Sequence, residues 1–132
     1  MQYQNLEDGF LILFEKDEPL MSGLSEFMQK HQIAGGFIQG LGALKDVRLG
    51  FYHLHQKTYQ ERTLKGDFEL VSLIGNASWC DGKPIIHCHA GLGDEEFRLH
   101  GGHLFEGHVA VVTEVYLRTT ATKVNRKFSD SM

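Results

Sequence analysis

Two histidines separated by one residue, His87 and His89, are the part of this sequence best suited to bind a metal ion. They follow Asp81-Gly82, a strong turn signal, and the apolar pair Ile85-Ile86 begins a strand directly after that turn. Side chains alternate between the two faces of a strand, so both imidazoles project from one face, with their Cα atoms about 7 Å apart. Both rings can lean toward one ion, at bond lengths of about 2.0–2.1 Å. The spacing therefore predicts part of a metal site.

A third ligand must come from another part of the chain, and two histidines compete for that place. His103 follows Gly101-Gly102, whose missing side chains would let the backbone approach closely. His100 precedes these glycines, and alternation cannot decide between the two histidines because the glycines interrupt it. A His-x-His pair alone is better explained as two partly exposed side chains bonded to carbonyl groups or water. With His103 added we expect a three-histidine site for zinc, since imidazole suits zinc and no thiolate is positioned to join.

Other residues could contribute to chemistry at such a site. Glu114 lies on a strand face with apolar neighbours, where its carboxylate is either simply exposed or serves as an acid, a base or a partner of a metal ligand. Asn76 and Ser78 could orient a bound ligand, although both residue types are also common in ordinary turns. Cys88 faces away from the two histidines by alternation, which predicts a small buried side chain in the core.

The rest of the sequence predicts a sheet with one principal helix. Apolar residues recur at helical spacing over residues 20–31, after an acidic start, Asp17-Glu18-Pro19, that suits the positive end of a helix dipole. Alternating hydrophobicity and glycine-rich turns predict strands over residues 9–15, 37–44, 47–55, 58–64, 68–75, 85–90 and 108–118. Short connections between consecutive strands favour antiparallel pairing. The expected fold class is α+β, with one main helix packed against a curved, mostly antiparallel sheet.

The composition is that of one ordinary globular domain. The chain has 132 residues, 42% of them hydrophobic and 23% charged, which is enough apolar material for a single core. We expect this domain to span residues 1–118 and to be followed by a polar, frayed tail over residues 119–132. Residues 1–7 are polar and the first apolar run is too short for a signal peptide or a membrane span. Two cysteines without a secretion signal favour a cytoplasmic protein with reduced thiols.

The net charge of −4 argues against a protein whose main task is to bind nucleic acid. Neutralisation of phosphates dominates nucleic-acid affinity and requires a basic surplus. The only basic cluster lies in the tail and consists of Arg118, Lys123, Arg126 and Lys127. No helix with basic residues along one face is visible. We therefore expect no tight, sequence-specific binding of duplex DNA by this chain alone.

Taken together, these segments resemble the plants-and-prokaryotes-conserved (PPC) domain, which in plants follows AT-hook DNA-binding motifs. The matching motifs, in order, are Gly40-Leu41-Gly42-Ala43, Gly66-Asp67-Phe68-Glu69-Leu70, Gly75-Asn76-Ala77-Ser78, Asp81-Gly82-Lys83-Pro84, His87-Cys88-His89, Gly101-Gly102-His103-Leu104 and Thr113-Glu114-Val115. The resemblance implies a compact α+β domain that assembles as a homotrimer. In prokaryotic members it implies a metal site at the positions of His87, His89 and His103. No Arg-Gly-Arg-Pro AT-hook is present in this sequence.

The resemblance extends to the acetolactate decarboxylase fold group, in which a His-x-His pair and a later histidine hold zinc. Three functions are compatible with these observations. The first is a metal-binding trimer whose site takes a small molecule or anion, and the second is a DNA-associated regulatory module that acts through partner contacts. The third is a metal-dependent lyase or hydrolase, because zinc held by three neutral histidines lowers the pKa of bound water to about 7. Likeness of fold does not establish chemistry, so the third function ranks below the first.

Overall fold

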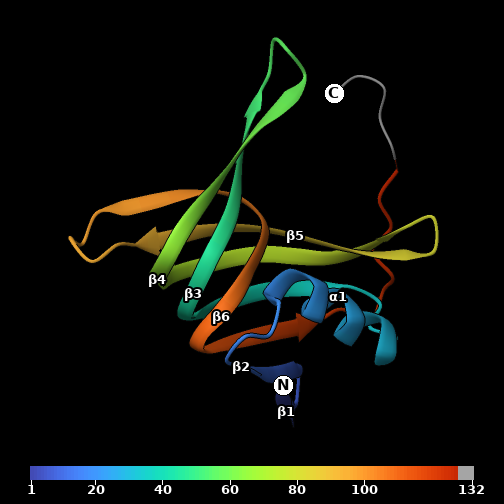
Figure 1. The fold of residues 1–132 in the computed structure, drawn as a ribbon. Helices are drawn as coiled ribbons and strands as arrows, with labels where there is room; N and C mark the ends of the chain where they lie inside the picture. Colours follow the sequence, from blue (N-terminus) through green and yellow to red (C-terminus); the bar gives the residue numbers. More distant parts are fainter. Residues whose placement is uncertain (128–132) are drawn as a thin grey trace.

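A computed structural model, described here for residues 1–127, contains six strands and one helix in those residues (Figure 1). The elements are β1 (Gln2–Leu6), β2 (Gly9–Glu15), α1 (Leu20–Lys30), β3 (Gly36–His53), β4 (Thr58–Cys80), β5 (Lys83–Gly93) and β6 (Leu99–Thr119). All pairings between these strands are antiparallel, in the order β1-β2-β6-β3-β4-β5. Because β5 also pairs with β6, the strands β3, β4, β5 and β6 close into a ring. The predicted antiparallel sheet with one helix is confirmed.

The strands are longer than the sequence pattern predicted. β2 covers the predicted residues 9–15, but the two predicted strands 37–44 and 47–55 form the single strand β3. The strands predicted over 58–64 and 68–75 likewise merge into β4. Register shifts occur in β3 between Gly40 and Gly42 and between Lys45 and Val47, where Asp46 has a φ of 50°. These bulges interrupt the alternation while the strand continues, which bends the sheet and explains why one strand looked like two.

β1 was not predicted, and its sequence explains why. All five of its residues are exposed, so the strand carries no apolar alternation. It is held by backbone pairing to β2 and by the ring of Tyr3, which packs against Phe10 and Phe27. The helix was predicted over residues 20–31 and ends one residue earlier, at Lys30. With 11 residues α1 is far too short to cross a membrane, and no longer apolar helix occurs within residues 1–127.

The core lies between α1 and the inner face of the sheet. The helix buries Leu20, Leu24, Phe27 and Met28 against side chains such as Phe14 of β2. Each fully buried side chain of this size contributes about 1.5–3 kcal/mol relative to an exposed one. The opposite face of the sheet has no helix over it in the described part of the chain, and the long β3–β4 hairpin extends away from the rest of the molecule (Figure 1).

The beginning of α1 is stabilised differently from the way its sequence suggests. Asp17 forms an ion pair with Lys45, and Glu18 bonds the N-terminal ammonium group, so neither carboxylate caps the helix. The carboxylate of Glu106 on β6 instead accepts hydrogen bonds from the backbone N–H of Met21 (2.7 Å), the backbone N–H of Ser22 (3.0 Å) and the Ser22 hydroxyl (2.9 Å). The expected negative charge at the helix dipole is therefore present, but it comes from a distant strand.

The segment after β6 is bound to the domain rather than frayed. Trp79 donates its backbone N–H to the carbonyl of Val124 (2.8 Å), and Arg126 donates its backbone N–H to the carbonyl of Trp79 (2.7 Å). These bonds form an isolated parallel bridge beside the end of β4. The expectation of a frayed tail is wrong up to residue 127, and residues 128–132 lie outside the described part. The domain boundary at residue 118 remains a prediction.

Candidate metal centre

Strand β5 places His87 and His89 on its outer face, as alternation predicted. Cys88 between them is fully buried, Ala90 after them is nearly so, and His89 is exposed. Burial raises the pKa of the Cys88 thiol to about 12, so this sulfur stays protonated and cannot serve as a thiolate ligand. The prediction that Cys88 is a core side chain is confirmed.

His103 reaches the pair through the pairing of β5 with β6. In this ladder His89 lies directly opposite His103, and directly opposed residues of antiparallel strands share a face. The two preceding glycines permit the approach: a Cβ atom on Gly101 would lie 2.9 Å from the carbonyl oxygen of Ala90, and one on Gly102 would lie 2.8 Å from that of Gly50. The expectation that Gly101-Gly102 allows close backbone approach is therefore confirmed.

The three histidines form one compact group. One ring nitrogen from each lies within 4.8 Å of the others. The ring centroids are 5.1 Å apart for His87 and His103, 5.4 Å for His87 and His89, and 5.6 Å for His89 and His103. Two nitrogens bound to one tetrahedral zinc ion are about 3.4 Å apart, given bonds of about 2.0–2.1 Å. Nitrogens that lie within 4.8 Å of one another are therefore close to this separation.

The surroundings of the group favour neutral histidines. Burial lowers the pKa of His87 below its usual value, and the positive charges of Arg126 and a protonated His89 lower it further. Burial also lowers the pKa of His103, with the neighbouring histidines acting in the same direction. Within residues 1–127 the buried Nδ1 atom of His103 has no hydrogen-bond partner. Neutral imidazoles and an unpaired buried nitrogen are what a divalent metal ion requires of this donor set.

Two aromatic rings flank His103 and restrict its orientation. The centroid of the Phe105 ring lies 4.7 Å from that of His103, and the Tyr59 centroid lies 5.1 Å away. The absence of a side chain at Gly50 makes room for them, because a Cβ atom there would lie 2.4 Å from Cε2 of Phe105 and 2.9 Å from Cδ1 of Tyr59. The ring of His103 is therefore packed between two aromatic side chains before any ligand binds.

The sequence reasoning missed Arg126 as a neighbour of this site. Its Nε donates to the hydroxyl of Ser78 (2.7 Å) and its Nη2 donates to Oδ1 of Asn76 (2.6 Å). The same Nη2 lies 3.4 Å from Nδ1 of His87. Asn76 and Ser78 were candidates for orienting a ligand, and the structure shows them orienting an arginine. The basic cluster in the tail was visible in the sequence, but nothing there indicated that the segment folds back along β4.

The other two candidates lie away from the histidine group. His100 donates its Nε2–H to Oδ2 of Asp94 (2.8 Å), and it is not one of the three grouped histidines. Glu114 is exposed near the other end of β6, where it pairs with Leu13 of β2 and Leu41 of β3. Of the two competing histidines the structure therefore brings His103 to the pair, and it does not bring Glu114 there.

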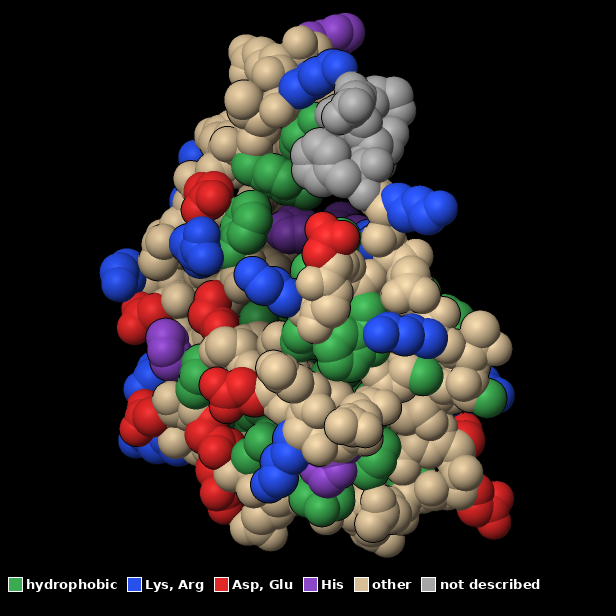
Figure 2. Space-filling model, turned by 90° about the vertical axis from the view of Figure 1, so that its right-hand side faces the viewer, with side chains coloured by type: hydrophobic (Ala, Val, Ile, Leu, Met, Phe, Trp, Pro, Cys, Tyr) green, Lys and Arg blue, Asp and Glu red, His purple; other side chains and the backbone are tan. Residues whose placement is uncertain are grey.

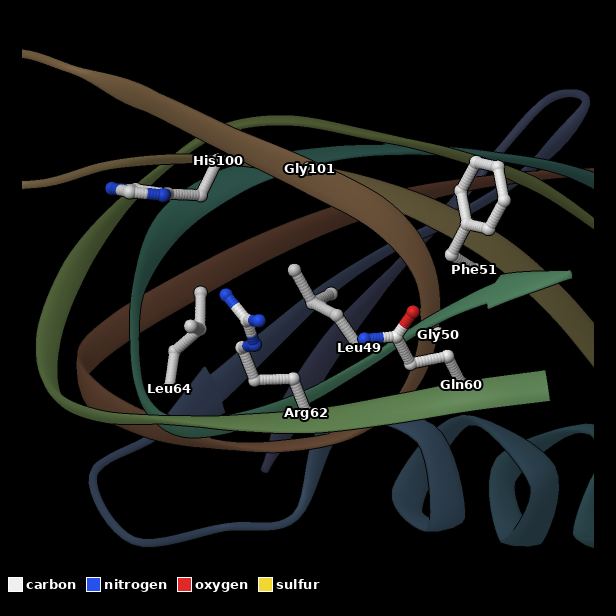
Figure 3. Close-up of a pocket in the computed structure, with 8 residues that line it drawn as sticks. All are labelled: Leu49, Gly50, Phe51, Gln60, Arg62, Leu64, His100 and Gly101. Atoms are coloured by element: carbon white, nitrogen blue, oxygen red, sulfur yellow. The ribbon is translucent and has the colours of Figure 1, made fainter.

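A separate pocket of about 250 Å³ is lined by residues of β3, β4 and β6. Figure 3 shows the guanidinium group of Arg62 pointing into it, with His100 at one edge and Phe51 at the other. Leu49 and Phe51 line this pocket. Gly50 between them pairs with His103, so by alternation along β3 their side chains lie on the face opposite to that of the His103 ring. None of the three grouped histidines lines the pocket.

Figure 2 shows the side of the molecule that lies on the right in Figure 1. Basic and acidic side chains are interspersed there with hydrophobic ones, and the described residues form no continuous basic area on it. The distribution agrees with the negative net charge of the chain. On this face, the described residues therefore provide no surface of the kind that binds a phosphate backbone.

Comparison with solved structures finds close relatives of this fold. A PPC protein from Pyrococcus horikoshii is 37% identical, with a TM-score of 0.88 over 98% of this chain and 90% of its own. A metal-containing protein from Archaeoglobus fulgidus is 28% identical, with a TM-score of 0.86 over 99% of this chain and 94% of its own. A candidate DNA-binding protein from Bacteroides thetaiotaomicron is 21% identical, with a TM-score of 0.95 over 98% of this chain and 91% of its own, which shows the common fold alone.

A more distant likeness agrees with the expected relation to acetolactate decarboxylase. A Staphylococcus aureus protein similar to that enzyme is 14% identical, with a TM-score of 0.58 over 92% of this chain and 56% of its own. This likeness concerns the fold alone. Comparison with curated protein sequences gives no match. The model of the Plants and Prokaryotes Conserved domain, abbreviated PCC or PPC, matches residues 1–121. The chain therefore belongs to the plants-and-prokaryotes-conserved domain family.

Proposed function

We propose that this chain is a metal-binding PPC protein that holds a divalent ion through His87, His89 and His103. Zinc is the first choice for this ion. The observation that carries the proposal is the convergence of three histidine nitrogens within 4.8 Å on one sheet face. Three imidazoles without a thiolate or carboxylate suit zinc, although nickel, copper and iron accept the same donors. The metal-containing relative from Archaeoglobus fulgidus supports the proposal at 28% identity.

Three protein ligands leave a coordination position for a small molecule, anion or water. When bound, the ion would supply Lewis acidity, which polarises a ligand or lowers the pKa of bound water. The protein's own contribution is to hold the rings: the β5–β6 ladder fixes His89 against His103, and the flanking aromatic rings restrict His103. No reaction is part of the proposal, because no acid or base in the described chain is placed beside the histidines in the way that catalysis of a named reaction would need.

The proposed assembly is a homotrimer, and an exposed apolar patch supports association of copies of the chain. The patch surrounds two adjoining hollows on the sheet surface and its side chains are between 56% and 70% exposed. Its members are Leu41, Val71, Leu99 and Val111. Neighbouring exposed apolar side chains of this size are typical of a surface that is covered in an assembly. Light scattering at micromolar concentration should give a mass near three times 14.9 kDa, and a stable monomer would contradict the proposed assembly.

The metal site is tested by elemental analysis of untagged protein, because a polyhistidine tag would itself bind metal. The wild-type chain should carry close to one ion per chain, and His89→Ala should carry almost none. Cys88→Ala is the matched control: its side chain lies between the two histidines in sequence but faces the core, so it should retain the ion. A full complement of metal in His89→Ala, or loss of the metal in a folded Cys88→Ala, would contradict the proposal.

The DNA-associated module remains the second candidate, with less support. Two relatives that carry such a description are only 21% and 22% identical, which shows the fold and not the activity. The chain is acidic overall, with a net charge of −4. Action through partner contacts does not require a basic surface, so this candidate rests on protein partners rather than on direct contact with DNA.

A further inference from the structure

The geometry points to Arg126 as a ligand-binding residue of the metal centre, which assigns to that centre a small carboxylate ligand held jointly by the ion and this guanidinium. The inference rests on the proposed metal binding by the three histidines and adds the chemical class of the ligand. Arg126 belongs to the segment after β6, outside the strands that carry the histidines.

Both the backbone and the side chain of Arg126 are held in place. Its backbone N–H donates to the carbonyl of Trp79 (2.7 Å), next to the bridge between Trp79 and Asn125. Its Nε donates to the hydroxyl of Ser78, itself a buried side chain, at 2.7 Å. Its Nη2 donates to Oδ1 of Asn76 at 2.6 Å. A guanidinium fixed at this many points is positioned before any ligand arrives, which reduces the entropy lost on binding.

The fixed guanidinium lies against the histidine group with donors to spare. Nη2 is 3.4 Å from Nδ1 of His87, one of the three proposed ligands. Arginine has five N–H donors; the bonds to Ser78 and Asn76 use two of them, and the contact of Nη2 with His87 takes a third. Within residues 1–127 no acceptor is recorded for the N–H groups of Nη1. These donors are therefore available to a molecule bound at the neighbouring ion.

Charge distinguishes Arg126 from the other arginines that form contacts. Arg48, Arg98 and Arg118 are each paired with a carboxylate, of Glu61, Asp94 and Asp8 respectively. The recorded side-chain partners of Arg126 are a hydroxyl, an amide oxygen and an imidazole, none of which carries a negative charge. Its positive charge is therefore not neutralised by the described part of the protein.

The positive charge of the proposed ion is likewise not neutralised by its protein ligands. The ligand group contains only histidines, which must be neutral to bind a metal, and no Asp or Glu belongs to it in the described chain. A divalent ion beside a guanidinium would thus leave three uncompensated positive charges close together. A carboxylate would neutralise part of this positive charge. One of its oxygens can take the open coordination position while the other accepts a hydrogen bond from the guanidinium, and guanidinium–carboxylate pairs are among the strongest charge-assisted hydrogen bonds.

The test uses untagged protein loaded with cobalt(II), whose visible absorption reports on the coordination of the ion, and titration with acetate. Wild-type protein should show a saturable change of the spectrum. In Arg126→Gln acetate should bind about 10- to 100-fold more weakly, the usual cost of losing a charge-assisted hydrogen bond. Neutral imidazole should bind both proteins within about twofold. Arg62→Gln removes an arginine of the separate pocket on the other face and should leave acetate binding unchanged.

Each other outcome overturns a defined part of this reasoning. If the wild-type protein takes up no cobalt, the proposed metal site fails and the ligand assignment fails with it. If cobalt binds but Arg126→Gln binds acetate as well as wild type does, only the role of Arg126 fails. If Arg126→Gln loses cobalt itself, Arg126 supports the metal ligands and does not bind the added molecule. If inorganic phosphate binds in an Arg126-dependent way and acetate does not, the assignment to carboxylates is wrong.

Discussion

Replacing Glu106 should show how strongly a strand residue stabilises the beginning of α1. One oxygen of this carboxylate accepts from the backbone N–H of Met21 (2.7 Å) and the other accepts from both the N–H and the hydroxyl of Ser22 (3.0 and 2.9 Å). The first N–H groups of a helix have no partner within the helix, so Glu106→Ala leaves them to water. Ser22 is exposed and water can replace its partner, whereas Met21 is buried. The main cost therefore comes from Met21.

The size of the effect follows from known capping energies. Loss of a capping side chain costs about 1–2 kcal/mol, and the charge at the helix dipole accounts for about 0.3–1 kcal/mol of such effects. The entropy of unfolding is about 2.1 cal/mol/K per residue, which for 132 residues gives about 0.28 kcal/mol/K. Glu106→Ala should therefore lower Tm by about 4–7 °C and Glu106→Gln, which keeps an acceptor but loses the charge, by about 1–4 °C.

Scanning calorimetry of the metal-free variants measures this effect, and Glu114→Ala is the matched control. Glu114 is a carboxylate on the same strand, but it is exposed and no hydrogen bond or ion pair of its side chain is recorded in residues 1–127. Its replacement should change stability by less than about 0.5 kcal/mol. If Glu106→Ala and Glu114→Ala melt at the same temperature, the contacts of Glu106 do not stabilise the helix and the reasoning is refuted.

Three further predictions concern the reactivity of the two thiols, the stability of the protein at low pH, and DNA binding. Cys88 should not react with a thiol reagent in the native protein, because burial raises its pKa to about 12, whereas the partly exposed Cys80 should react; labelling of both at equal rates would contradict this. The bond from His100 and the backbone N–H of Arg98 lower the pKa of Asp94, so its ionised form adds stability above its unfolded pKa of about 4, and this stability is lost as the pH falls through the lower folded value. Asp94→Asn should therefore be less stable than wild type at pH 7, with the difference shrinking below pH 4 in urea unfolding. Nanomolar, sequence-selective DNA binding in a gel shift at physiological salt should be absent, since the net charge is −4, and its presence would favour the regulatory candidate.

Alternation predicted much of the local structure around the site because it depends only on neighbouring residues. His87 and His89 share a face and Cys88 is buried, as the strand pattern required. The prediction could not choose between His100 and His103, because that choice depends on the register between β5 and β6. The structure pairs His103 with His89 and His100 with Leu92, and Asp94 bonds the ring of His100. No rule based on spacing within one strand contains that information.

The remaining misses also involve contacts between residues far apart in sequence. The acidic residues before α1 suggested a local cap, yet the cap comes from Glu106, 85 positions after Met21. The polarity of residues 119–127 suggested a frayed tail, but backbone bonds to Ala34, Gly35 and Trp79 hold this segment. The merging of predicted strands into β3 and β4 has a related cause, since bulges break the local pattern while the partner strand keeps the pairing intact.

The position of the histidine group connects the proposed site to the closure of the sheet. β5 and β6 pair only from His89 and His103 to Gly93 and Leu99, whereas β3 and β4 pair from Gly36 and Ala77 to His53 and Thr58. The β5–β6 ladder is thus the shortest of the four ladders that form the ring, and His89 and His103 are the residue pair at one end of it. An ion bound by histidines of both strands would join β5 to β6 at that end, and binding to the folded state alone would stabilise the closed ring. Because a side chain at Gly101 would clash with β5 and one at Gly102 with β3, the closure of the sheet and the assembly of the proposed ligand set depend on the same two glycines.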